Sequence, residues 1–248
     1  MKIIVCVKMV PDTTTKIEVA GNGKDIDRSG VEYVLNPYDE YAVEEALSIK
    51  EKFPGSEVVI LSMGPSESIK TIRTALAMGA DSGVLLTAES KDTFVIAKAL
   101  ANELSSLGPD IVLLGKQAVD DDNCQVGGLV AEFLGLPFVS SIVKLELEEN
   151  NATAKREREG GYDLVEVPLP CVFSAQKGLN EPRYATLRGI MMAKRKPIDQ
   201  KEPTLPEPLL EEVSLHLPPV RTGGRIVGEG KDAVPELVKL LKEEAKVI

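Results

Sequence analysis

The sequence predicts an α/β protein: a Rossmann-like parallel sheet of the adenine-nucleotide-binding type, with a small antiparallel extension and a C-terminal arm. Short apolar, β-branched runs recur at residues 3–7, 58–62, 84–87 and 111–114, with helical patterns between them. The second and fourth runs are almost continuously apolar, as expected of parallel strands covered by helices on both faces. At 248 residues, 43% of them hydrophobic and 27% charged, the chain can build one sizeable core.

Two helices are predicted within the first eighty residues. The first starts at Asn36-Pro37 and runs to about Lys52, because Asn accepts hydrogen bonds from free N–H groups and Pro needs no donor at the first helical position. Pro54-Gly55 ends it before the next strand. The second follows Gly64-Pro65, where apolar residues recur at helical spacing over 69–76.

Beyond about Ser140 the pattern changes. Apolar and polar residues alternate at 142–147, 153–158 and 164–167, around turns at 149–151 and 160–161. This alternation predicts an antiparallel ribbon.

Prolines recur from Pro197 to Pro219, which predicts an extended arm because proline suits neither a helix interior nor a central strand. An amphipathic helix is predicted at 233–246. The expected organisation is therefore a nucleotide-binding domain over 1–196 and an extended arm over 197–248 that ends in a helix.

Charge and rare residues exclude several classes of function. The chain has 39 acidic and 29 basic residues and a net charge of −10, which disfavours nucleic acid as a partner. The three cysteines lack the spacing of a redox or zinc motif, and we expect a cytoplasmic protein without a signal peptide or membrane insertion. The single histidine, His216, lies in proline-rich sequence, so we expect no histidine triad and no metal site built from several histidines.

Three segments are expected at the carboxyl edge of the sheet, where helix N-termini bind phosphate: residues 36–39, 63–66 and 115–127. Three adjacent carboxylates, Asp120 to Asp122, suit an anion poorly, so we expect them to face solvent or cap the next helix, with a metal site as the minor alternative. Backbone N–H groups, Gln125 and Lys116 are then the expected nucleotide contacts. Neither a G-x-G-x-x-G nor a P-loop motif is present, so this interpretation rests on position in the fold.

Residues 177–196 contain both large apolar residues and basic ones. Leu187, Ile190, Met191 and Met192 stand among arginines and lysines. Such a segment is either a partner-binding surface or an amphipathic helix packed on the core with a solvated basic end.

Several blocks of the sequence resemble the β subunits of electron-transfer flavoproteins. The longest is Leu-Asn-Glu-Pro-Arg-Tyr-Ala-Thr-Leu at 179–187, which continues through Ile190-Met191 to Pro197. The loop 115–122 with Gln125, the pair Asn36-Pro37 and the block 71–81 match further parts of that family. The resemblance spans the chain from the first strand to about Pro197.

The resemblance implies a heterodimer without independent catalysis by this chain. In that family an α subunit holds most of a redox-active FAD, and the β subunit buries an AMP of structural role. The heterodimer shuttles electrons between flavin dehydrogenases, such as acyl-CoA dehydrogenases, and a membrane or soluble acceptor. Residues 178–196 would form a recognition loop that binds the dehydrogenase.

Carried over position by position, the resemblance also implies site residues. Tyr38 would approach the flavin held by the α subunit, and Leu187 would be the apolar anchor in a pocket of the partner. The implied cofactor contacts are Cys6, Asn36, Pro37, Tyr38, Asp39, Met63, Gly115, Lys116, Gln117, Ala118, Val119, Asp120, Asp121, Asp122, Asn123, Cys124, Gln125 and Val126. The implied partner contacts are Arg183, Tyr184, Leu187, Ile190 and Met191.

Two positions resemble a different branch of the family. Thr13 and Val126 match the electron-bifurcating members, in which a second FAD replaces AMP in the β subunit. The Asp120–Asp122 triplet and the 179–187 block match the AMP-binding members instead. AMP is the favoured expectation, a second FAD is the alternative, and a stand-alone nucleotide-binding sensor domain is the alternative from another class.

Overall fold

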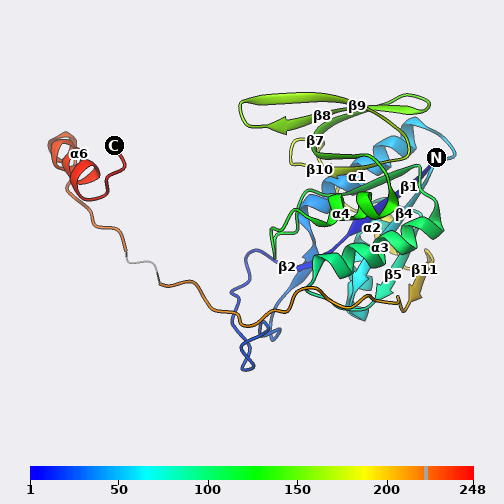
Figure 1. Ribbon diagram of the computed structural model, residues 1–248, viewed down its shortest axis with the longest axis horizontal. Helices are drawn as coiled ribbons and strands as arrows, with labels where there is room; N and C mark the ends of the chain where they lie inside the picture. Colours follow the sequence, from blue (N-terminus) through cyan, green and yellow to red (C-terminus); the bar gives the residue numbers. More distant parts are fainter. Residues whose placement is uncertain (221–222) are drawn as a thin grey trace. The chain divides into compact units, whose positions relative to one another are not determined.

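The computed structural model describes residues 1–220 and 223–248 (Figure 1). It divides the chain into two compact units, Met1–Leu215 and His216–Ile248. Each unit is described by itself.

The first unit is built on a nine-stranded sheet in the order β11-β5-β4-β1-β6-β10-β7-β8-β9, in which all neighbours are parallel except β7-β8 and β8-β9. Its strands are β1 (Lys2–Val7), β4 (Glu57–Gly64), β5 (Ser82–Thr87), β6 (Ile111–Gly115), β7 (Phe138–Leu147), β8 (Asn151–Arg158), β9 (Gly161–Pro168), β10 (Cys171–Ala175) and β11 (Ile198–Lys201). A separate antiparallel pair joins β2 (Met9–Pro11) to β3 (Tyr33–Leu35).

Helices cover both faces of the parallel part of the sheet. They are α1 (Pro37–Lys52), α2 (Ile69–Met78), α3 (Thr93–Leu107), α4 (Val126–Leu134) and α5 (Leu187–Ala193), with a short 3₁₀ helix at Ser66–Ser68. Along β1, Ile3 and Val5 belong to the apolar cluster formed with α1 and α2, while Ile4 and Cys6 belong to the cluster formed with α3 and α4. The two clusters explain why the central strands are apolar at successive positions.

The predicted parallel strands and first two helices are confirmed. All four predicted runs lie within β1, β4, β5 and β6. Pro37 is the first residue of α1, and α2 begins at Ile69. The antiparallel ribbon is also confirmed, as β7, β8 and β9.

Two strands of the main sheet were not predicted, and neither was the separate pair β2-β3. β10 is a fully buried run that inserts between β6 and β7, so the ribbon continues the main sheet through the parallel pair β10-β7. β11 pairs in parallel with β5 at the start of the predicted arm. Its exposed polar residues, Asp199 to Lys201, gave no strand pattern because it lies at the sheet edge. The boundary between residues 196 and 197 stays a prediction.

The second unit contains the predicted C-terminal helix. α6 (Val234–Glu243) follows a 3₁₀ turn at Lys231–Ala233, and Arg225 pairs with Glu244 at 2.5 Å. None of the described residues of this unit is buried. Across the described parts of both units, every helix is too short or too polar to cross a membrane.

Candidate functional site

Asp39, in the first turn of α1, joins the carboxyl ends of the two central strands. Its Oδ2 accepts a hydrogen bond from the backbone N–H of Lys8 at 2.7 Å, and its Oδ1 accepts one from Gly115 at 2.9 Å. Burial raises the pKa of Asp39 to about 7, against the opposite effect of these donors. A Cβ atom on Gly115 would collide with this carboxylate, so the loop that starts there requires glycine.

Asn36 holds the same loop with its side chain. The expected helix cap is wrong: Asn36 is the N-cap residue of α1, but its side chain makes no capping hydrogen bond. Instead, Nδ2 donates to the carbonyl of Gln117 at 2.9 Å, and Oδ1 accepts from the N–H of Val119 at 3.3 Å. An amide side chain has both donors and an acceptor, so it can bind a carbonyl and an N–H group of the adjacent loop. A helix N-terminus offers only N–H donors. The loop is therefore attached to α1 and β1 by two buried side chains.

Lys8, the residue after β1, neutralises two of the three loop carboxylates. Its Nζ lies 2.7 Å from Asp120 and 2.9 Å from Asp121. Burial would lower the pKa of Lys8, but these two carboxylates outweigh that effect and raise it. Asp122 instead accepts a hydrogen bond from Gln117 at 2.6 Å. Of the two outcomes expected for the triplet, solvent exposure is confirmed, since all three residues are exposed. Capping of the next helix is wrong, because the N-cap of α4 is Gln125 and has no side-chain capping bond.

Gln125 is oriented by α3. Thr93 donates its hydroxyl to Oε1 of Gln125 at 2.8 Å, so the amide group is fixed at the start of α4. Among the described residues, no partner is recorded for its Nε2 group, which leaves a donor at a helix N-terminus. Cys6 lies at the same edge, where burial, with a smaller effect of Asp39, raises the pKa of its thiol to about 12. Its thiol is uncharged and therefore a poor nucleophile.

These groups surround a hollow of about 970 Å³ at the carboxyl edge of the sheet. Most of the implied cofactor contacts line it: Cys6, Asn36, Asp39, Met63, Gly115 to Asp121, and Asn123 to Val126. Pro37, Tyr38 and Asp122 do not line it. The lining also includes Thr13 and Leu210, the latter from the predicted arm. The structure therefore brings the three predicted edge segments together.

Two functional groups were missed by the sequence analysis. Lys8 directly follows a buried strand, and a lone cation at that position was a signal for an anion or carboxylate partner at the sheet edge. Asp92 is the N-cap of α3 and accepts hydrogen bonds from the backbone of Phe94, Leu209 and Leu210, so it attaches the chain after β11 to the rim of the hollow. No sequence spacing indicates that contact. Within residues 1–220 and 223–248, no acidic, histidine or cysteine side chains cluster as a metal site requires.

The segment 178–186 is attached to α1. Arg183 forms a bidentate pair with Glu44, with both N···O distances 2.8 Å, and a further pair with Glu51 at 2.6 Å. Asn180 donates to the carbonyl of Tyr41 and to Glu45, both at 3.0 Å. The guanidinium of Arg183 is thus occupied within the chain.

The apolar residues that follow are exposed. Tyr184 is 96% and Leu187 83% exposed, and Ile190, Met191 and Met192 are exposed as well. Thr186 caps α5 by accepting a hydrogen bond from the N–H of Gly189 at 3.0 Å. Of this segment, only Ala193 is buried in the core. The structure favours the exposed surface over the buried amphipathic helix for Leu187.

Comparison with known proteins gives consistent matches over the whole chain. Residues 24–206 match the family model described as electron transfer flavoprotein domain. The electron transfer flavoprotein subunit beta of Syntrophomonas wolfei is 41% identical over 249 residues, covering 100% of this chain and 98% of that protein. That of Bacillus subtilis is 40% identical over the full length of both chains. A caffeyl-CoA reductase-Etf complex subunit, CarD of Acetobacterium woodii, is 40% identical over 80% of this chain and 77% of its own.

Proposed function

This chain belongs to the electron transfer flavoprotein family, as a β subunit, and we propose that it is the non-catalytic half of an αβ heterodimer whose α subunit holds most of an FAD. We assign no catalytic step to it. None of the described residues that line the edge site is a histidine, and burial raises the pKa of its thiol, Cys6, to about 12. The three cysteines are free, which suits the cytoplasm as the proposed compartment.

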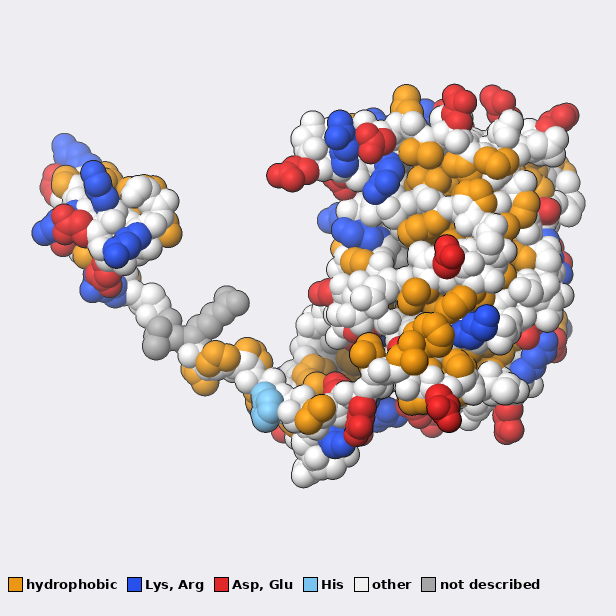
Figure 2. Space-filling model, in the orientation of Figure 1, with side chains coloured by type: hydrophobic (Ala, Val, Ile, Leu, Met, Phe, Trp, Pro, Cys, Tyr) orange, Lys and Arg blue, Asp and Glu red, His pale blue; other side chains and the backbone are white. Residues whose placement is uncertain are grey.

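The unit His216–Ile248 supports the heterodimer. Its helix α6 exposes Val234, Leu237 and Val238. Figure 2 shows apolar and charged side chains next to each other on this helix. A ten-residue helix with an unburied apolar stripe is not expected to be stable alone in water. We assign the α subunit as the partner that covers it.

Co-expression with the α subunit tests this assignment. The full chain is expected to co-elute with the α subunit as a yellow heterodimer, and a chain ending at Leu215 to lose most of that association. The truncated chain keeps the whole sheet, so its own unfolding transition serves as the control. A colourless β monomer from the full-length co-expression would refute the heterodimer.

For the hollow at the sheet edge we propose AMP. Two features support a nucleotide: the backbone and Gln125 donors at the start of α4, and the loop held open by Asn36, Asp39 and Lys8. The carboxylates that would repel a phosphate are paired with Lys8 or with Gln117.

A second FAD is the competing ligand. About 970 Å³ lies near the upper end of the roughly 300–1,000 Å³ usual for ligand sites, so a dinucleotide would fit as well. The similarity to a caffeyl-CoA reductase-Etf complex subunit and the residues Thr13 and Val126 favour it. Adding AMP or FAD to nucleotide-depleted heterodimer separates the two: AMP alone is expected to raise its unfolding temperature to the original value. Recovery with FAD and not with AMP would contradict the AMP proposal.

For electron transfer we propose docking of a flavin dehydrogenase, such as an acyl-CoA dehydrogenase, on the segment 178–196, and transfer onward to a membrane or soluble acceptor. The exposure of Leu187 beside Tyr184 and Met191 supports this surface. The expected observation is bleaching of the heterodimer flavin by a dehydrogenase reduced with its acyl-CoA substrate. If no acyl-CoA dehydrogenase of the same organism bleaches the heterodimer flavin, this partner class is refuted.

A further inference from the structure

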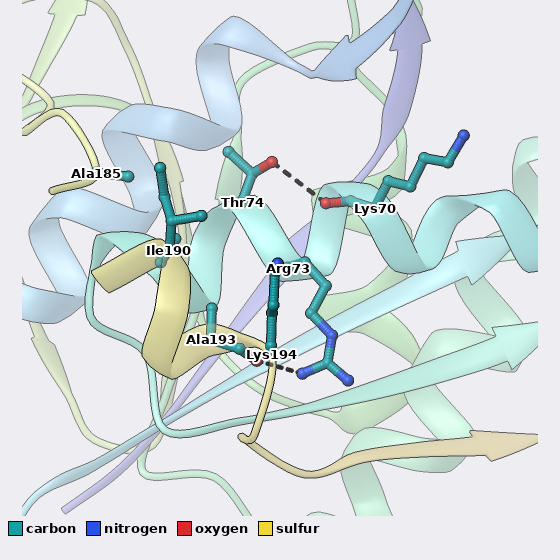
Figure 3. A pocket seen from close by; sticks show the side chains of 8 residues that line it. Lys70, Arg73, Thr74, Ala185, Ile190, Ala193 and Lys194 are labelled. Atoms are coloured by element: carbon teal, nitrogen blue, oxygen red, sulfur yellow. Dashed lines mark hydrogen bonds between the residues drawn. The ribbon is translucent and has the colours of Figure 1, made fainter. Parts of the chain in front are cut away.

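A cleft of about 490 Å³ lies between α2 and α5, outside the nucleotide hollow. Its apolar lining is Ala77, Ala185, Ile190 and Ala193, and Lys70, Arg73 and Lys194 stand around it. Figure 3 shows α5 lying across α2, with Ile190 and Ala193 turned toward it and Lys70 extending outward from α2.

The two helices are held together by cations that bind each other's last carbonyl groups. Arg73 of α2 donates to the carbonyl of Ala193 and, at 2.7 Å, to that of Lys196. Lys196, in turn, donates to the carbonyls of Leu76 and Ala80 at the end of α2, at 2.9 and 2.5 Å. Cations at helix C-termini satisfy carbonyls that have no partner within the helix. The cleft is therefore formed before any partner binds.

Gly189 sets the distance between the helices. A Cβ atom at this position would collide with the backbone carbonyl oxygen of Ala77 on α2. The absence of a side chain lets α5 pack against the backbone of α2, and Leu187 and Met191 remain on the outer side, exposed.

The charge of this face differs from that of the chain as a whole. The chain carries a net charge of −10, yet residues 69–78 and 187–196 contain no acidic residue. Arg73 and Lys196 are used to join the helices, but no partner is recorded, within the described residues, for the side chains of Lys70, Arg188, Lys194 and Arg195. Unpaired cations around an apolar surface fit a partner that brings carboxylates next to an apolar side chain.

We propose that α2 and α5 form one preassembled docking face, whose cleft receives an apolar side chain of the partner while Lys70 and Lys194 pair with carboxylates beside it. The occupant is an acidic surface segment of the flavin dehydrogenase, so the inference rests on the proposed function and extends its partner surface from the 178–196 segment to α2. A preformed cleft lowers the entropic cost of binding, because few side chains have to be ordered.

The test measures reduction of the intact heterodimer by an acyl-CoA dehydrogenase of the same organism, with its acyl-CoA substrate as electron source. Lys70→Ala and Lys194→Ala are each expected to raise the KM for the heterodimer about two- to fivefold, as for loss of an exposed ion pair. They are also expected to weaken the salt dependence of KM, leaving kcat and flavin content unchanged. Lys144→Ala, which removes one exposed lysine from β7, is the matched control.

Lysine acetylation provides a second measurement that does not depend on turnover. Lys70 and Lys194 are expected to react in the free heterodimer and to be protected when the dehydrogenase is added, while Lys144 reacts equally in both. If Lys70 and Lys194 are already protected from acetylation in the free heterodimer, the α subunit covers this face. If inorganic phosphate alone protects them, the face binds a small anion. Either result overturns the proposal.

The failures can be told apart. If the dehydrogenase fails to reduce the wild-type heterodimer, the proposed partner class is wrong and this inference falls with it. If the wild type is reduced and both lysine variants behave like Lys144→Ala, only the α2–α5 docking face is refuted.

Discussion

The substitution Asp39→Asn tests how the loop 115–127 is held to the sheet. Both carboxylate oxygens of Asp39 accept backbone N–H groups, from Lys8 at 2.7 Å and Gly115 at 2.9 Å. An amide of the same size keeps one acceptor and replaces the other with an NH₂ donor, which then faces an N–H group. One of the two buried backbone donors is left without an acceptor.

The structure indicates the size of the loss. Asp39 is 5% exposed, so water does not replace the missing acceptor. An unsatisfied buried donor costs about 1–3 kcal/mol, a large part of the roughly 5–15 kcal/mol that stabilises a folded protein. Asp110 offers a matched control, because its Oδ2 accepts the N–H of Lys2 at 2.7 Å at the opposite, exposed end of the same strands. Asp110→Asn is expected to cost under about 1 kcal/mol, since water reaches that site.

Urea unfolding of the heterodimer and its bound nucleotide content measure both consequences. In urea at pH 5, Asp39→Asn is expected to lower the free energy of unfolding by about 1–3 kcal/mol. It is also expected to weaken nucleotide binding, by roughly tenfold in affinity for each 1.4 kcal/mol lost at the loop. Asp110→Asn is expected to retain its nucleotide. Equal stability of the two variants, with full nucleotide in both, would refute the structural role of Asp39.

Four further outcomes are expected. Burial raises the pKa of Asp39 from 3.8 to about 7, so between these pH values the folded state holds a proton that the unfolded state has lost. The contribution of this group to the free energy of unfolding therefore falls as pH rises. The loss of unfolding free energy caused by Asp39→Asn is expected to shrink from pH 4 to pH 7 in urea titrations, and a constant loss would contradict this. Arg183→Met leaves Glu44 without its charged partner and is expected to speed proteolysis within 178–186 on the order of tenfold, whereas an unchanged cleavage rate would show that the pair does not hold the segment. Leu187→Ala is expected to raise the KM for reduction by the dehydrogenase while flavin content and folding stay unchanged. Loss of the folded heterodimer would show that Leu187 stabilises the fold instead. Gly189→Ala is expected to displace α5 from α2 and to raise the same KM, and a wild-type value would refute the close approach of the helices.

The parallel core was predictable because periodicity in the sequence reflects burial directly. The runs that became β4 and β6 are apolar at nearly every position, and helices on both faces demand that pattern. β11 was missed because only one of its four residues is even half-buried, and an edge strand needs no such pattern. β10 was missed although it is buried throughout, because its five residues follow an antiparallel ribbon and local alternation gave no sign of a return to the parallel sheet.

The location of the site was predictable from the sequence, but the side-chain contacts within it were not. That residues 36–39, 63–66 and 115–127 meet at one edge follows from the rule that parallel strands share a carboxyl end. That Lys8 pairs with Asp120 and Asp121 depends on the register of β1 against β6 and on separations of over a hundred residues, which no local pattern encodes. The same holds for Asn36, whose local sequence suits a helix cap equally well.

The segment 178–196 was predictable in its location and not in how it is attached. Its residues were identified from composition, but composition cannot tell a loop that is attached to the rest of the protein from one that is mobile. Only the contacts of Arg183 with α1 and of Arg73 with the end of α5 distinguish them.

Counting the nucleotides released by acid from the purified αβ heterodimer tests the central claim most directly. One FAD and one AMP per heterodimer are expected, with AMP absent from an α subunit purified alone. Two FAD and no AMP would contradict the assignment of AMP to the edge of this chain, and a heterodimer with no adenine nucleotide beyond its FAD would contradict the nucleotide site itself.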